Sequence, residues 1–281
     1  MSGILIDGRT IAAHIRSDIR STILREHIKP GLAVIMIGDH APSTIYVNAK
    51  VKACNDVGIK STVIRLPQKA SEAELLTCID ALNDNPDVHG ILLQLPLPEY
   101  FHVGPILERI APHKDVDGLH PHNLGLVLSG RATLIPCTPQ GIMHLIHHVE
   151  PNITGMSAIV VGCSMLVGRP LGQLLLDADC TLTHVHSKTP NIAQYTRDAD
   201  ILVVAAGSPG LITESMVKPG AIVIDVGITR TENGIVGDVC FNDVKNIARA
   251  ITPVPGGVGP MTIACLLKNT LLASQNQQSK S

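Results

Sequence analysis

Apolar residues follow two alternating patterns along the first 110 residues of the chain. Short runs rich in β-branched residues at 32–37, 61–66 and 89–93 each predict a strand. Between these runs, apolar residues at helical spacing predict helices over 43–57, 71–83 and 103–110. Ser43 is the expected N-cap of the first helix, and Ser71 with Glu74 has the spacing of a capping box. Strands that alternate with helices predict parallel βαβ units.

The same alternation returns in the second half of the chain. Strands are predicted over 157–161, 181–186, 201–205 and 221–226, and a short one near Ile251. Helices are predicted after Gly168 and over 191–197, 213–217 and 261–273. The polar tail, residues 274–281, is expected to be frayed. No repeat of solenoid type relates the two halves.

A stretch dense in proline, glycine and histidine, residues 112–139, separates these regions. It holds one predicted helix, 123–128, and Thr138-Pro139-Gln140 opens another that ends near Val149. A length of 281 residues is enough for two domains of roughly 100–200 residues each. The pattern therefore predicts an α/β chain of two domains joined through this stretch.

Composition excludes several classes of function. A net charge of −2 gives no general attraction to nucleic acid or anionic membranes, and the near absence of aromatic residues argues against base-stacking platforms. The N-terminus lacks the pattern of a signal peptide, and no apolar run reaches the ~18 residues of a membrane span. Seven dispersed cysteines without a C-x-x-C pair are typical of reduced thiols in a cytoplasmic protein.

A glycine turn after the strand 157–161 is the first candidate site. Gly162-x-Ser164-x-x-x-Gly168 lies between a predicted strand and a predicted helix, which is where a dinucleotide pyrophosphate binds. The alternative is an ordinary strand-to-helix turn. The next strand ends without the acidic residue that holds the ribose of NAD, and Ser187 and Lys188 would suit a 2′-phosphate. The sequence thus favours NADP, although a solvent-exposed turn also explains Lys188.

A second set of candidates lies in the first half. Tyr46 and Lys50 are four residues apart and share one face of a predicted helix, either as an acid/base pair or as a solvated pair. Gln94 directly follows a predicted strand, at the end where parallel sheets bind ligands. Asp117 lies in a short charged turn and remains ambiguous. The histidine pairs 120/122 and 147/148 match no metal-binding spacing, so we expect no metal site.

Read together, these segments resemble the bifunctional methylenetetrahydrofolate dehydrogenase/methenyltetrahydrofolate cyclohydrolases over nearly the whole chain. The matching motifs, in order, are Ser43-x-x-Tyr46-x-x-x-Lys50, Gly90-Ile-Leu-Leu-Gln94-Leu-Pro-Leu-Pro98, Pro112-x-Lys114-Asp115-Val116-Asp117-Gly118, Pro136-Cys-Thr138-Pro139-x-Gly141, Val161-Gly-x-Ser164-x-x-Val-Gly168-x-Pro170, Asp225-Val-Gly227-Ile228 and Pro253-Val-Pro255-Gly-Gly-Val-Gly259-Pro-Met-Thr262. The last of these is particularly specific.

The resemblance implies a role for each matching residue. Lys50 would be the cyclohydrolase catalytic residue, Gln94 would hydrogen-bond and tune it, Tyr46 would pack on the folate, and Asp117 would anchor the pterin. The remaining implied contacts are with substrate, from Leu93, Pro255, Gly256 and Gly259, and with cofactor, from Gly162, Cys163, Ser164, Ser187 and Ile228.

The resemblance also implies an architecture. An N-terminal parallel-type α/β domain, residues 1–138 completed by the C-terminal helix in 258–281, would bind folate. A Rossmann-like NADP-binding domain would span 139–257, with the active-site cleft between the two, and the enzyme would be a homodimer. One departure matters: many relatives carry an arginine at the position of Cys163 that helps to bind the 2′-phosphate, so Cys163→Arg should widen a preference for NADP.

The implied function is oxidation of 5,10-methylenetetrahydrofolate with NADP, followed by hydrolysis to 10-formyltetrahydrofolate. Two alternatives remain open at this point: an NADP-linked dehydrogenase of another small substrate, and a non-catalytic dinucleotide-binding module. The first would not need Gln94 and Asp117 together with Lys50, and the second should have lost Lys50 or Asp117.

Overall fold

The computed structural model describes residues 3–232 and 234–278, and the chain forms two compact units. One contains residues 14–137 and the chain from 263 onward, and we call it the three-stranded unit after its sheet. The other contains residues up to 13 and 138–262, and we call it the six-stranded unit. The predicted α/β architecture of two domains is confirmed.

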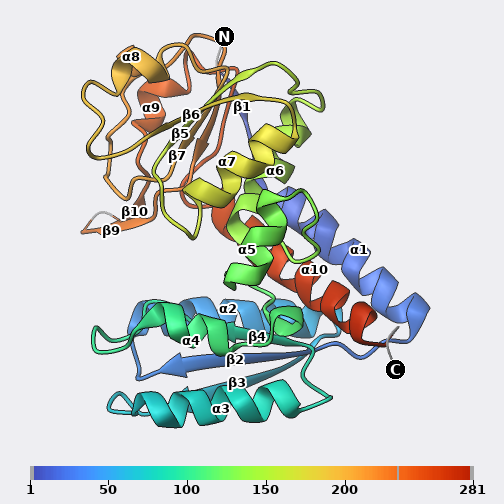
Figure 1. Cartoon of the computed structure of the whole chain (residues 1–281). Coiled ribbons are helices and arrows are strands. Elements are labelled where there is room, and N and C mark those ends of the chain that lie inside the picture. The colour runs from blue at the N-terminus through green and yellow to red at the C-terminus, as the bar shows by residue number, and fades with distance from the viewer. Residues whose placement is uncertain (1–2, 233, 279–281) are drawn as a thin grey trace. The chain divides into compact units, whose positions relative to one another are not determined.

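The three-stranded unit is built on a parallel sheet with the order β3-β2-β4 (Figure 1). Its strands are β2 (Gly31–Ile37), β3 (Lys60–Leu66) and β4 (Gly90–Leu93). The helices of this part of the chain are α1 (Gly8–Glu26), α2 (Ala41–Val57), α3 (Glu72–Asp84), α4 (Val103–Arg109), the 3-10 turn η1 (Pro112–Lys114), α5 (Pro121–Leu128) and α10 (Val258–Gln278). Helices α1 and α10 lie side by side (Figure 1).

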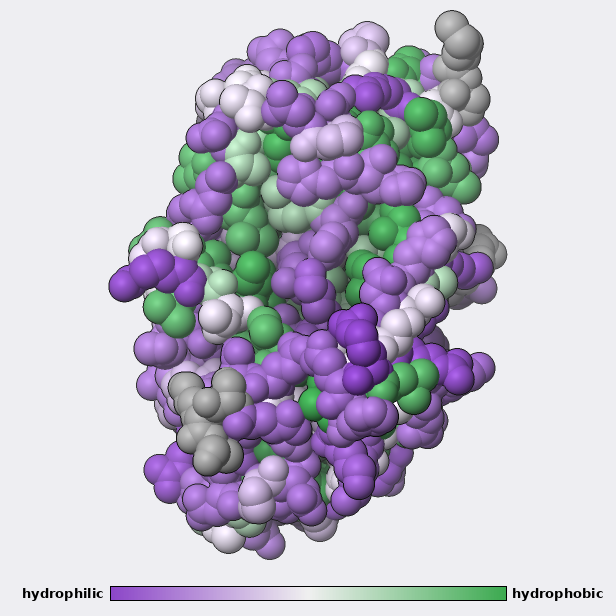
Figure 2. Space-filling view, turned by 90° about the vertical axis from the view of Figure 1, so that its right-hand side faces the viewer, coloured by the Kyte–Doolittle hydropathy of each residue, from purple (hydrophilic) through white to green (hydrophobic). Residues whose placement is uncertain are grey.

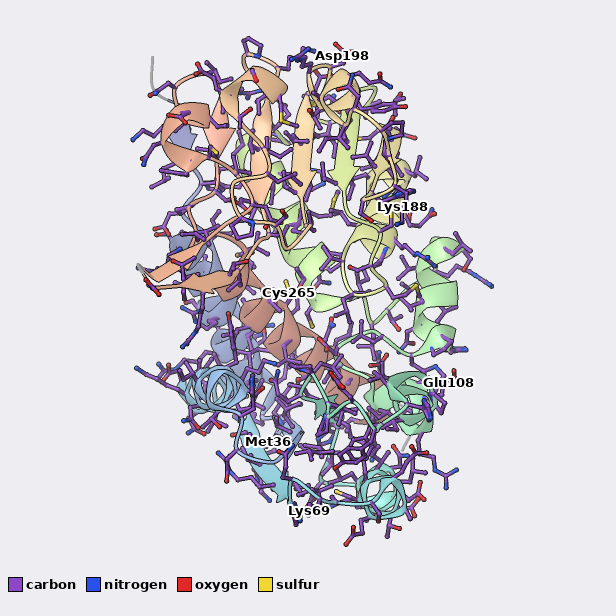
Figure 3. All side chains as sticks on the ribbon, turned by 90° about the vertical axis from the view of Figure 1, so that its left-hand side faces the viewer. Met36, Lys69, Glu108, Lys188, Asp198 and Cys265 are labelled. Carbon is purple, nitrogen blue, oxygen red and sulfur yellow. The ribbon has the colours of Figure 1, made fainter. Side chains whose placement is uncertain are left out.

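Both faces of β2 are covered, and all seven of its residues are buried. Leu32, Val34 and Met36 pack into a cluster with side chains of α1, α2 and α10. The alternate residues Ala33, Ile35 and Ile37 pack against side chains of α3 and around α4. Figure 3 locates Met36 on β2 and Cys265 on α10, two members of the first cluster. A continuous apolar run is what a parallel strand buried on both faces requires.

Two N-cap residues were predicted, and one is confirmed. Ser71 caps α3: its hydroxyl accepts from the Glu74 amide at 3.2 Å, and the Glu74 carboxylate accepts from the Ser71 amide at 2.7 Å. The prediction for Ser43 is wrong, because the N-cap of α2 is His40. Ser43 is a buried residue of the first turn, and its hydroxyl lies 3.0 Å from His40 Nδ1.

The six-stranded unit has a parallel sheet with the order β1-β11-β8-β7-β5-β6. The strands are β1 (Ile4–Leu5), β5 (Ser157–Val161), β6 (Thr181–Val185), β7 (Ile201–Val204), β8 (Ile222–Asp225) and β11 (Ala250–Ile251). The other elements are α6 (Cys137–Val149), α7 (Gly168–Asp177), α8 (Ala193–Thr196), η2 (Glu214–Met216), α9 (Phe241–Val244) and the hairpin β9 (Thr229–Thr231) with β10 (Gly234–Val236). This is the expected Rossmann-like arrangement.

The chain ends differ from the expected domain ranges. Strand β1 pairs with β11, so the first residues join the six-stranded unit rather than a domain spanning 1–138. The stretch 112–139, expected as a link, instead belongs up to residue 137 to the three-stranded unit.

The tail predicted to fray is helical as far as Gln278. Gln275 donates to Glu26 Oε2 at 2.7 Å, and Gln277 donates to the His89 carbonyl at 2.9 Å. Ser274 is fully buried. These contacts hold the polar end of α10 in place; residues 279–281 lie outside the described part.

No helix within the described residues is long and apolar enough to cross a membrane. On the face drawn in Figure 2, hydrophobic residues form small patches among hydrophilic ones. Scattered exposed apolar side chains of this kind are ordinary for folded proteins.

Candidate active site

Lys50 and Gln94 form a direct pair in the three-stranded unit. Lys50 lies in α2, and its Nζ donates to Gln94 Oε1 at 3.0 Å. Gln94 directly follows β4. Its backbone amide donates to the Ile35 carbonyl and so extends the hydrogen bonding between β4 and β2. The Gln94 Nε2 donates to the Leu95 carbonyl at 2.6 Å, which leaves Oε1 to face the lysine. The sheet and the side-chain amide therefore hold the lysine amine at a fixed point.

The environment of Lys50 favours its neutral form. Burial lowers the pKa of the Lys50 amine below its ordinary value, because the charged form loses hydration. The charge of Asp117 opposes this shift, so the pKa of Lys50 results from the two effects together. Among the described residues, Lys50 and Asp117 make no direct ion pair, and the hydrogen-bond partner of Lys50 is the neutral Gln94. An amine with a lowered pKa is neutral in a larger fraction of molecules than a free lysine, so it is more often available to accept a proton.

Asp117 is half-buried close to Lys50. Burial raises the pKa of the Asp117 carboxyl, and the positive charge of Lys50 counteracts the rise. The negative charge of Asp115 raises the pKa of Asp117 further, while a hydrogen bond with Cys137 lowers it. Asp117 is thus a carboxyl group near the lysine amine, in a site of reduced hydration.

The neighbours of Asp117 in the motif 114–118 serve the fold. Lys114 Nζ donates to the carbonyls of Leu82, Asn83 and Asn85 and so satisfies the C-terminal end of α3. One oxygen of Asp115 accepts from the His120 amide and from Asn123 Nδ2, both at 2.8 Å. Asp117 is left as the carboxylate of this motif that is available to a ligand.

Asn269 in α10 supports this turn, and the sequence reasoning did not identify it. Its Nδ2 donates to the carbonyls of Val116 at 2.9 Å and Ile135 at 2.8 Å. The Cys137 thiol also donates to the Val116 carbonyl, at 3.2 Å. Asn269 is almost fully buried, so these are bonds in a dry environment. A polar asparagine within the apolar sequence Leu-Leu-Lys-Asn-Thr-Leu-Leu is the signal that could have indicated it.

The two other predicted substrate residues of this unit differ in exposure. Tyr46 lies one turn before Lys50 and is 38% exposed, so its ring is open to a ligand. Leu93 is buried in the cluster under α3 and α4, where its side chain supports the sheet. A contact between Leu93 and a substrate would therefore use its backbone.

The glycine turn of the six-stranded unit has no room for side chains at two positions. Gly162 has a φ of +123°, and a Cβ there would lie 2.3 Å from the Ala205 carbonyl oxygen. A Cβ on Gly168 would lie 2.0 Å from the Gly162 carbonyl oxygen. The tight turn between β5 and α7 that a dinucleotide pyrophosphate needs is therefore built by these two glycines.

The other predicted cofactor residues lie around the same end of this sheet. Ser164 is exposed, and its hydroxyl accepts from the Val167 amide at 3.2 Å. Cys163 is half-buried, with its Sγ 3.8 Å from His184 Nδ1. Ser187 is exposed in the turn after β6, and Ile228 is 47% exposed after β8. The carboxyl ends of β5, β6 and β8 thus carry the predicted set.

Pro255, Gly256 and Gly259 lie around the start of α10 and belong to the six-stranded unit. Gly256 has a φ of +117°, and the guanidinium of Arg9 lies beside it, 3.3 Å from the position of an added Cβ. The sequence had assigned residues from 258 onward to the folate-binding domain, whereas the contacts extend the six-stranded unit to residue 262.

Two buried carboxylates order the loops after β7 and β8, and the sequence reasoning missed this role. Asp225 accepts from the amides of Gly227, Asp238 and Val239, each at 2.9 Å. Asp238 Oδ2 accepts from the amides of Ala206 and Gly207 at 2.8 Å. Burial raises the pKa of Asp225 to about 6 against the opposing effect of its hydrogen bonds. No group of three or more candidate metal ligands occurs among the described residues.

Comparisons with known proteins agree with this geometry. Residues 6–117 match the model for the catalytic domain of tetrahydrofolate dehydrogenase/cyclohydrolase, and residues 136–278 match its NAD(P)-binding domain. The chain belongs to the tetrahydrofolate dehydrogenase/cyclohydrolase family. Membership identifies it as an enzyme and supports the predicted dehydrogenase/cyclohydrolase activity over both alternatives.

Relatives within the family match over their whole length. The bifunctional protein FolD of Pelagibacter ubique is 51% identical over 279 residues, covering 98% of this chain and 99% of the relative. The bifunctional FolD methylenetetrahydrofolate dehydrogenase/cyclohydrolase of Campylobacter jejuni has a crystal structure that is 45% identical, with a TM-score of 0.95 over 98% of this chain and 99% of that one. The Trypanosoma brucei enzyme, solved with NADP and an inhibitor, is 36% identical, with a TM-score of 0.95 over all of both chains.

Proposed function

We propose that this enzyme oxidises 5,10-methylenetetrahydrofolate to 5,10-methenyltetrahydrofolate with NADP and then hydrolyses the product to 10-formyltetrahydrofolate, in one-carbon folate interconversion. The observation that carries the proposal is the partly buried Lys50 amine on the neutral Gln94 amide, beside Asp117. Membership in the family supplies the substrate class.

The oxidation needs positioning more than it needs a base. NADP, held by the turn between Gly162 and Gly168, would supply the hydride acceptor for the carbon that lies between two folate nitrogens. A nitrogen lone pair stabilises the resulting cation, so no proton has to leave and no side chain has to remove one. The tasks left to the protein are to orient the pterin, through Asp117 and the exposed ring of Tyr46, and to exclude water.

The hydrolysis needs proton transfers, and Lys50 is placed for them. As the water oxygen bonds to the methenyl carbon, the neutral Lys50 amine takes a proton from that water. The ammonium then returns that proton to N5 as the bond between N5 and the carbon breaks. The remaining hydroxyl proton leaves to solvent as the C=O bond forms, so a formyl group is left on N10. The lowered pKa of Lys50 supports this role, because the neutral amine is the form that can accept the first proton. The cyclohydrolase rate should therefore rise with pH as the neutral form becomes more abundant.

The six-stranded unit is the proposed site of NADP. The turn between Gly162 and Gly168 supports this site, because its close backbone contacts exclude a side chain at either glycine, and a tight glycine turn between strand and helix is where a pyrophosphate binds. Cys163, Ser164 and Ile228 would contact the cofactor, and Ser187 would contact the 2′-phosphate. No carboxylate stands at the end of β6 to repel that phosphate. We propose residues 14–137 with the part of α10 from residue 263 onward as the folate-binding domain, and Pro255, Gly256 and Gly259 as further substrate contacts.

We also propose a homodimer in the cytoplasm. The resemblance to the family supports the dimer, and the seven free thiols fit a reducing compartment. The mass in solution, measured by light scattering on the eluted protein, tests the dimer: twice the chain mass supports it, and the mass of one chain contradicts it.

The activity is tested by an absorbance scan of the purified chain with methylenetetrahydrofolate and NADP. We expect reduced NADP to accumulate only when both are present, and added methenyltetrahydrofolate to disappear faster than without enzyme. Absence of reduced cofactor with this substrate would overturn the proposed oxidation.

A further inference from the structure

Arg169, the second residue of α7, folds back over the glycine turn. Its Nε donates to the Cys163 carbonyl at 3.1 Å, and its Nη1 lies 3.4 Å from Met165 Sδ. The residue is exposed, so the rest of the guanidinium faces solvent. We propose that Arg169 determines the choice of NADP over NAD by binding the 2′-phosphate, a phosphomonoester. This inference rests on the proposed cofactor.

The turn under Arg169 lies beside the turn that carries Ser187. Strands β5 and β6 are neighbours with Val161 opposite Val185, and the Gly162 amide donates to the Val185 carbonyl at 2.8 Å. Cys163 and Ser187 therefore follow the ends of two adjacent parallel strands. A group bound between them would meet the Ser187 hydroxyl on one side and the guanidinium of Arg169 on the other.

The positive charge at this edge has few sources. His184 contacts Cys163, and burial lowers its pKa, with the charge of Arg169 lowering it further. Arg169 is therefore close enough for its charge to act on the His184 ring, which itself lies beside the Cys163 thiol. Arg169 forms no ion pair with a carboxylate of the described residues, so its charge is not already neutralised.

Lys188 is the other cation nearby, and Figure 3 places it near α7 with its side chain at the surface. The hydrogen bond that holds Lys188 is made by its backbone, whose amide donates to His186 Nδ1 at 3.2 Å. Arg169 is held by its own hydrogen bond and presents a planar group that matches two phosphate oxygens. Less freedom is lost when a side chain already held in place binds a ligand, which favours Arg169 as the determinant.

The test compares kcat/KM with NADP and with NAD, at one ionic strength, for the wild type, Arg169→Ala and Arg197→Ala. Arg197 is a matched control, because it is also exposed and donates from Nε to a carbonyl, that of Ser215. We expect Arg169→Ala to lower the ratio of kcat/KM with NADP to kcat/KM with NAD about tenfold or more, since a hydrogen bond to a charged group is lost. The decrease should come from kcat/KM with NADP, while kcat/KM with NAD stays unchanged. Arg197→Ala should leave the ratio unchanged. The value with NAD shows whether each variant is folded.

A second variant asks whether the charge itself is what matters. Cys163→Arg should restore the ratio in the Arg169→Ala background, and should raise it by a smaller factor when Arg169 is present. A wild-type ratio above one that Arg169→Ala leaves unchanged would overturn this inference while the proposed cofactor stands. A wild-type ratio below one would overturn the proposed cofactor itself.

Discussion

Lys50 and Gln94 connect the sequence to the chemistry at the scale of single residues. The spacing of Tyr46 and Lys50 predicted a shared helix face, but a solvated pair had the same spacing. The hydrogen bond from Lys50 to Gln94 joins residues 44 positions apart, so no local pattern could have predicted it. The resemblance to the family implied this contact, and the structure confirms it.

The buried amine should be visible in the stability of the protein. The folded-state pKa of Lys50 is lowered, so between that pKa and the ordinary value of about 10.4 the unfolded chain binds more protons than the folded one. The free energy of unfolding of the wild type should therefore rise, relative to that of Lys50→Met, as pH rises through this window. Urea denaturation of both proteins from about pH 7 to about pH 10 measures the difference. A difference that is independent of pH would contradict the lowered pKa.

Asp115 and Asp117 should respond differently to substitution. Asp117→Ala should weaken folate binding roughly tenfold or more, since a charge-assisted hydrogen bond is lost, with little change in NADP affinity or thermal stability. Asp115→Ala should lower stability instead, because the His120 amide and Asn123 lose their shared acceptor. Titration of both ligands and thermal melts separate the two effects. Unchanged folate affinity with lost NADP affinity would show that Asp117 serves the other ligand.

At the scale of elements, periodicity predicted the apolar strands of both sheets and most of the helices between them. Strand β5 has the predicted bounds, and α3 has the predicted capping box. Helix α1 and the two-residue strand β1 were not predicted. The last turns of α10 depend on distant partners such as Glu26 and His89, which the polar local sequence does not indicate.

Asn269 shows how much an element can depend on one distant contact. Asn269→Leu leaves the Val116 and Ile135 carbonyls without this donor, at a cost of about 1–3 kcal/mol for each unsatisfied group, so we expect a loss of roughly 2–5 kcal/mol. Gln275→Ala, which removes a half-buried side chain of the same helix, should cost at most about 1 kcal/mol. Chemical denaturation measures both. Equal effects of the two substitutions would contradict a specific role for Asn269.

At the scale of the whole molecule, the alternation of strands and helices was enough to predict two α/β domains. The motif Gly162–Gly168 indicated a dinucleotide site, and the structure explains both glycines by close backbone contacts. The domain limits were less predictable, because β1 pairs with a strand about 245 residues away. Arg169, Asp225 and Asp238 were missed for a related reason: their roles come from contacts that only the folded turns create.

The central claim is that Lys50 carries out the hydrolysis that follows the oxidation. The most direct test measures the disappearance of methenyltetrahydrofolate, corrected for the rate without enzyme, in the wild type, Lys50→Met and Lys52→Met. Lys52 is the matched control, an exposed lysine of the same helix. We predict that Lys50→Met loses at least about 100-fold in rate, as expected for removal of a general acid–base group, while it remains folded and Lys52→Met stays active. Hydrolysis by folded Lys50→Met at the wild-type rate would contradict the account.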